Sequence, residues 1–133
     1  QVIGINTAKA SEGEGLGFAI PINTAKPIIE SIIQKGSYEK VTLGIKGTDA
    51  STYAKYSNQQ LSSEDGVYVS EVVSGSAAEK AGVKSGDIIT KIDDTDLSVM
   101  SDLTKHLYNY TTGDSATLVV NRHGKEVKLN VKF

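Results

Sequence analysis

Two patterns of apolar and polar positions follow one another along the chain. In the first part, short apolar runs at residues 2–5 and 16–20 predict two strands. Pro21 ends the second run, because proline has no N–H to donate to a sheet ladder. Residues 2–5 look like the inside of a strand rather than a natural start, so we expect the sequence to be a piece of a longer protein.

One amphipathic helix is predicted after these strands. It is marked by isoleucines at helical spacing, namely Ile28, Ile29, Ile32 and Ile33. We expect Asn23 or Thr24 to cap it and Pro27 to lie in its first turn, where the missing N–H does no harm. Gly36 is the expected residue just past its end. Residues 37–40 are polar and are interpreted as a linker.

From residue 41 onward the pattern predicts short strands and two helices. The expected strands are residues 41–45, 67–73, 88–92, 116–121 and 126–133. Ser76 and Glu79 form a capping box that opens the first helix, and Gly82 ends it. The second helix, expected to have a serine cap, is marked by Met100, Leu103, Leu107 and Tyr110. This order of elements indicates an α+β fold, with one domain at 1–36 and another at 41–133.

Composition narrows the functions that the chain can perform. Its 133 residues carry a net charge of −2 with both signs interspersed, so neither nucleic acid nor an anionic membrane is an expected partner. The absence of cysteine excludes disulfides and thiolate metal sites. No apolar run approaches the roughly 18 residues of a membrane span. The acidic turn around Asp93, Asp94 and Asp96 is interpreted as a solvated corner, and no metal or cofactor is expected.

The most specific feature of the sequence is segment 75–89. It combines a capped helix, a glycine stop, an apolar anchor at Val83, a glycine turn and a buried strand after Asp87. This run closely resembles PDZ domains, in which such a helix precedes a Gly-Asp-apolar-apolar strand, and the resemblance covers about residues 41–133. It implies that an extended peptide adds to a sheet edge through main-chain hydrogen bonds, while N–H groups of a short loop hold its terminal carboxylate.

Two segments are candidates for that carboxylate loop. Residues 15–18, Gly-Leu-Gly-Phe, match the loop motif of many PDZ domains, but Pro21 would interrupt the ladder that a peptide needs. The better candidate is Leu43, Gly44 and Ile45, because Gly44 lets the backbone turn its N–H groups toward an anion. The peptide-binding strand is then expected at Ile45, Lys46, Gly47 and Thr48. The pocket for the last peptide residue is assigned to Leu43, Ile45, Met100, Leu103 and Leu107.

This choice leaves almost no room for a strand before the loop, and the surplus strand 126–133 can take its place. The result is a circularly permuted PDZ domain, a five- to six-stranded partly open barrel with two helices, which is similar to PDZ domains of the HtrA/DegP family. Residues 2–8 and 15–21, followed by the isoleucine-rich helix, resemble the end of that family's trypsin-like protease domain. Residues 1–36 are therefore interpreted as a remnant of its β-barrel and C-terminal helix.

The resemblance implies a serine endopeptidase as parent, acting in protein quality control outside the cytoplasm, with or without a membrane anchor. The family's Gly-Asn-Ser-Gly-Gly motif and its catalytic His and Asp segments are absent from this sequence, so no catalytic residue is expected. His106 and His123 are interpreted as ordinary surface or half-buried histidines. The expected partners are C-terminal or unfolded peptide segments and a second copy of the chain through residues 1–36. In the alternative, the PDZ domain serves mainly oligomer assembly.

Overall fold

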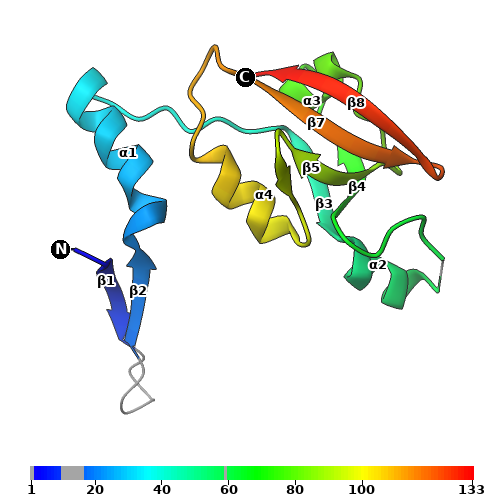
Figure 1. The fold of residues 1–133 in the computed structure, drawn as a ribbon, viewed down its shortest axis with the longest axis horizontal. Coiled ribbons are helices and arrows are strands. Elements are labelled where there is room, and N and C mark those ends of the chain that lie inside the picture. Colours follow the sequence, from blue (N-terminus) through cyan, green and yellow to red (C-terminus); the bar gives the residue numbers. More distant parts are fainter. Residues whose placement is uncertain (1, 10–16, 59) are drawn as a thin grey trace. The chain divides into compact units, whose positions relative to one another are not determined.

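The computed structural model describes residues 2–9, 17–58 and 60–133, and the chain divides into two compact units, Gln1–Glu39 and Lys40–Phe133 (Figure 1). In the first unit, β1 (Gly4–Lys9) pairs antiparallel with β2 (Gly17–Pro21), and α1 (Ile22–Lys35) follows directly. The two strands lie near the predicted apolar runs, but β1 extends further into the polar segment. Residues 15 and 16 of the rejected loop candidate lie outside the described residues.

The predicted beginning of α1 was wrong, although its end was right. Strand β2 runs straight into the helix, which starts at Ile22 with Pro21 before it and no side-chain cap. Pro27 therefore lies inside the helix, where its missing N–H leaves a carbonyl one turn earlier without its usual donor. At the other end Gly36 is left-handed, and its N–H donates to Ile32 O at 2.9 Å, as expected for the residue past a helix.

The second unit is an open antiparallel sheet with three helices. Its elements in chain order are β3 (Ile45–Asp49), α2 (Ala50–Ser57), β4 (Val67–Val72), α3 (Ala77–Ala81), β5 (Ile88–Ile92), β6 (Thr95–Asp96), α4 (Met100–Leu107), β7 (Ser115–Arg122) and β8 (Lys125–Lys132). The sheet order is β3-β4-β5-β7-β8, and β6 pairs with β5. The predicted α+β class is confirmed, and the C-terminal strand β8 takes an edge of the sheet beside β7 (Figure 1). The described strands form no closed barrel.

The structure of this unit differs from the prediction in its first strand and in an additional helix. The strand expected at 41–45 begins only at Ile45, and the segment before it is irregular. Helix α2 was not predicted, because its Tyr- and Ser-rich sequence shows no apolar stripe. It is held by Ala50, which is fully buried, and by the ring of Tyr53, which stacks on Tyr68 with centroids 3.7 Å apart.

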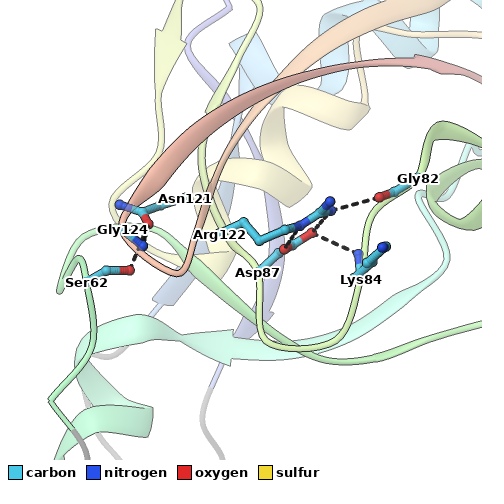
Figure 2. A network of polar contacts seen from close by, with 7 residues as sticks. All are labelled: Ser62, Gly82, Lys84, Asp87, Asn121, Arg122 and Gly124. Carbon is cyan, nitrogen blue, oxygen red and sulfur yellow. Dashed lines mark hydrogen bonds and ion pairs between the residues drawn. The ribbon is translucent and has the colours of Figure 1, made fainter.

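A buried ion pair joins the turn before β5 to the end of β7 (Figure 2). Asp87 is 1% exposed and lies against the Arg122 guanidinium, with Nε 2.7 Å and Nη2 2.8 Å from its two carboxylate oxygens. Arg122 also donates to Gly82 O, and Asp87 accepts from Lys84 N, each at 2.8 Å. Both charges are thus compensated, as buried charges must be. The sequence predicted a glycine turn before Asp87 and a buried strand after it, but it did not indicate the partner Arg122.

Candidate peptide-binding groove

The predicted carboxylate loop has a backbone that only glycine can supply. Gly44 is left-handed at φ 77°, and a Cβ there would overlap the Cβ of Ser76. The carbonyls of Leu43 and Gly44 accept from Ala78 N and Val73 N, both at 2.9 Å, so they point into the domain. Among the described residues, no hydrogen bond uses the N–H of Leu43 or Gly44. These two donors therefore remain for a ligand.

The strand after this loop has one open side, because β3 is an edge of the sheet. Val73 N donates to Gly44 O, so the residue pair just before β3 has one of the two hydrogen bonds of a bonded pair, while the left-handed Gly44 does not direct its own N–H to Val73. Bonded and non-bonded pairs alternate in antiparallel ladders, so the next pair, Ile45 opposite Val72, is non-bonded. The N–H and C=O of Ile45 therefore face the open edge, and those of Gly47 do so two residues further on.

A bulge opposite β3 does not disturb this alternation. The extra residue is Ser70 of β4, which lies between the partners of Lys46 and Gly47, and its hydroxyl donates to Lys46 O at 2.9 Å. Val69, the partner of Gly47, uses its own N–H and C=O for the 86–87 turn at 2.8 Å each. Of the four predicted strand residues, Ile45 and Gly47 thus direct their main-chain N–H and C=O groups to the open edge. The main-chain groups of Lys46 and Thr48 point to β4.

A cavity of about 200 Å³ lies beside the loop, between β3 and α4. All of the predicted pocket residues line it: Leu43, Ile45, Met100, Leu103 and Leu107. Leu43 and Leu103 are also almost fully buried, so they belong to the core of the second unit as well as to the cavity. The sequence prediction missed four lining residues with polar side chains: Lys40, Thr42, Thr104 and Tyr108.

Lys40 brings a positive charge to this cavity. Its Nζ lies 5.9 Å from the centroid of the Tyr108 ring, which is within the range of cation–π attraction. Tyr108 directly follows the last residue of α4, so one end of the cavity is bounded by a lysine and an aromatic ring. Lys40 was assigned to the linker because it sits in a polar stretch, and no local pattern marks it as a lining residue.

Carboxylates hold both ends of α4. The predicted serine cap is not found: the helix starts at Met100 after Val99, without a side-chain cap from that residue. Instead, Asp49 Oδ1 accepts from Met100 N at 2.7 Å. Beyond the other end, the Tyr110 hydroxyl donates to Asp93, and burial followed by this hydrogen bond raises the pKa of the tyrosine.

Other kinds of site find no support in the described part of the chain. It holds no group of three or more His, Cys, Asp or Glu side chains arranged for a metal ion. None of its helices is long and apolar enough to cross a membrane. His123 is exposed in the β7–β8 turn and His106 is half-buried beside Tyr110, as the sequence indicated.

Comparison with known proteins fits this geometry. The profile of the PDZ domain family matches residues 2–133. The chain is 42% identical to the serine protease Do-like HtrB of Bacillus subtilis, over 98% of this chain and 30% of that protein. It is 39% identical to the periplasmic pH-dependent serine endoprotease DegQ of Escherichia coli, over 98% of this chain and 29% of that protein. It therefore spans about 30% of the length of these curated relatives.

Solved structures give the same result. The HtrA-type protease AlgW with decapeptide has a TM-score of 0.76 and 29% identity, and the match covers 98% of this chain and 41% of that one. A structure of the same protease with tripeptide reaches a TM-score of 0.72 and 30% identity. The chain therefore belongs to the PDZ domain family, and its relatives are serine proteases of the HtrA/DegP type.

Proposed function

We propose that this chain is the peptide-binding module of an HtrA-like serine endopeptidase and takes apolar C-terminal peptides into the groove between β3 and α4. The observation that carries the proposal is an unpaired strand edge that runs beside an apolar cavity and starts at a loop with two unused N–H groups. These are the three parts needed for strand addition with capture of a terminal carboxylate.

Each part of the peptide meets a different part of the groove. The N–H groups of Leu43, Gly44 and Ile45 receive the carboxylate, and Lys40 adds a compensating charge nearby. Ile45 and Gly47 pair with the peptide main chain along the open edge. The last side chain enters the cavity between loop and helix, whose 200 Å³ is small beside the about 300–1,000 Å³ of typical small-molecule pockets and suits a single apolar side chain.

In the parent protein, such binding selects unfolded substrates or tunes proteolysis. Residues 1–36 are then the end of the trypsin-like domain, residues 37–40 the linker and residues 41–133 the PDZ domain. An extracytoplasmic location is supported by relatives named as periplasmic, DegQ and DegP of Escherichia coli. Since no catalytic serine, histidine or aspartate is assigned here, we expect the 133-residue chain not to cleave casein. Cleavage that a serine-reactive inhibitor blocks would contradict this.

The proposal is tested by calorimetric titration with a five-residue peptide that ends in valine, as free acid and as C-terminal amide. Hydrogen bonds to a charged group are worth about 1.5–3 kcal/mol each, so we expect the amide to bind at least about tenfold more weakly. Equal affinities for the two forms would overturn the assignment of the carboxylate loop. If the groove instead holds another subunit, the solution mass of the chain should fall when peptide is added.

A matched pair of variants locates the binding. Leu107 lines the cavity, whereas Leu129 on β8 is also half-buried but does not line it. Leu107→Ala should lower affinity for the valine peptide by about fivefold or more, since it removes apolar contact area, and Leu129→Ala should leave it unchanged. Substitution of Gly47 is unsuitable as a test, because any Cβ there would lie 2.5 Å from Tyr68 O and disturb β4 as well.

A further inference from the structure

The two walls of the groove belong to different parts of the chain, and a side-chain hydrogen bond joins their ends in addition to the packing of Leu43 and Leu103 in the core. One wall is β3 and the other is α4, which begins 51 residues after Asp49. Asp49 is the last residue of β3 and is half-buried, and its carboxylate accepts from Met100 N at 2.7 Å. This hydrogen bond joins the end of one wall directly to the first turn of the other.

Asp49 bonds to a helix other than the one that follows it in the chain. Asp49 immediately precedes α2, where an aspartate ordinarily accepts from N–H groups of its own helix. Here it makes no side-chain bond to α2. Its carboxylate is committed instead to α4, whose first N–H groups need acceptors that Val99 cannot offer.

The far end of the same helix is held by a second carboxylate. Tyr110 donates its hydroxyl proton to Asp93 in the turn between β5 and β6. The other oxygen of Asp93 accepts from Thr117 N at 2.7 Å, and Asp93 N donates to Thr117 O at 2.7 Å, so this turn is fixed to β7. Neither Asp49 nor the Tyr110–Asp93 pair lines the cavity. Of the residues that do, Met100 is itself the donor to Asp49, and Leu107 lies three residues before Tyr110.

We propose that Asp49 is a positioning residue that sets the width of the groove, with the Tyr110–Asp93 bond fixing the opposite end of α4. The inference rests on the proposed peptide binding. A peptide strand paired to β3 lies about 4.8 Å from it, so the position of α4 decides whether the peptide side chains fill the cavity or leave a void. Selectivity among terminal residues, rather than strand pairing itself, depends on these two bonds.

The test uses the full 133-residue chain and two five-residue peptides that differ only in ending with valine or alanine. The wild-type chain should prefer valine by about tenfold, since two buried carbons separate the side chains. In Asp49→Ala this preference should fall to about threefold or less. In Asp49→Asn it should stay near the wild-type ratio, because the amide oxygen keeps an acceptor at the same place.

This ratio separates positioning from a simple loss of structure. If a variant merely unfolds in part, the fraction of chains able to bind peptide falls. The apparent affinities for the valine and alanine peptides then drop by the same factor, and their ratio stays at the wild-type value. An unchanged ratio in Asp49→Ala would therefore overturn the inference, as would an Asp49→Asn variant as unselective as the alanine variant. Failure of the wild-type chain to bind either peptide would instead refute the proposed function.

Two further variants complete the experiment. Tyr110→Phe removes only the hydroxyl and should lower the valine-to-alanine ratio by about twofold, because α4 stays held at its other end. Asp96→Ala is the matched control: its exposed carboxylate pairs with Lys91 at 2.9 Å. It should leave the ratio unchanged. A drop in Asp96→Ala equal to that in Asp49→Ala would also contradict the inference.

Discussion

The unit 40–133 and the unit 1–39 treat their apolar side chains in opposite ways. The former buries a continuous set of them, including Val67, Val69, Ile89, Ile92, Leu103, Leu118, Val120 and Val131. In the described part of the latter, only Ala25 and Ser31 are buried, while a large apolar set is exposed: Val2, Ile3, Ile5, Phe18, Ile20, Ile29, Ile32 and Ile33. The same residue types thus form a core in one unit and a surface in the other.

The difference shows which of the two units has a hydrophobic core of its own. A two-stranded hairpin is marginal in water without a packed face, and contiguous exposed apolar patches mark surfaces that something covers. The unit 40–133 has the core that a small domain needs. We therefore expect stability to be decided in this unit and association to be decided in the first.

The largest effect is expected at the buried ion pair. Asp87→Ala leaves Arg122 without its carboxylate and should lower the free energy of unfolding by about 3–5 kcal/mol, as for other broken buried pairs. Glu71→Ala breaks the exposed Lys46–Glu71 pair of similar length, 2.9 Å, and should cost less than about 1 kcal/mol. Urea denaturation of both variants measures this contrast. Similar losses of unfolding free energy in the two variants would show that burial does not determine how much an ion pair stabilises this fold.

The core itself gives the next comparison. Leu118 is fully buried, so Leu118→Ala should cost about 2–5 kcal/mol through lost contacts and a cavity. Ile33 is 76% exposed, and Ile33→Ala should change the unfolding free energy by no more than about 0.5 kcal/mol. A large loss in Ile33→Ala would show that the first unit is packed against something in solution.

Local signals explain which parts of the fold were predictable. The helix α3 was foreseen because Ser76 and Glu79 lie three residues apart, and the Ser76 hydroxyl does accept from Glu79 N at 3.2 Å. The turn at His123 and Gly124 also has a local signal, because it contains a glycine between two predicted strands, and both of its residues are left-handed, as a tight hairpin requires. By contrast, α2 has no apolar stripe and depends on stacking with a strand that follows it.

Long-range bonds explain what the sequence could not show in the candidate site. The apolar lining was predictable from the spacing around Gly44 and along α4, and the structure brings those residues around one cavity. Asp49 and Met100 lie 51 residues apart, and Asp87 and Arg122 lie 35 apart. The local sequence around one residue of such a pair does not indicate which residue is its partner. Such pairs follow from the register of the sheet, which one sequence alone does not reveal.

Association is the third expected contrast. We predict that the exposed isoleucines of the first unit pair with a second copy of the chain, so the protein should run as a dimer or larger in sedimentation. Changing Ile32 and Ile33 to serine should weaken this self-association by about tenfold or more, since each removes a large apolar side chain from contact. A chain that is monomeric at all concentrations before the substitution would contradict the prediction.

The smallest effect concerns acid. The N–H of Thr117 and then the hydroxyl of Tyr110 lower the pKa of Asp93 below its ordinary value, against a small opposing influence of burial. Since the unfolded chain binds this proton more readily, the carboxylate stabilises the fold fully above its unfolded pKa of about 3.9 and loses this contribution as the pH falls through the lower folded value. Because the side chain is exposed, the gain should stay below about 1 kcal/mol. Melting temperatures of the wild-type chain and Asp93→Asn should therefore differ most near neutral pH and converge in acid. A difference that stays constant or widens below pH of about 4 would show that the charge of Asp93 does not stabilise the fold.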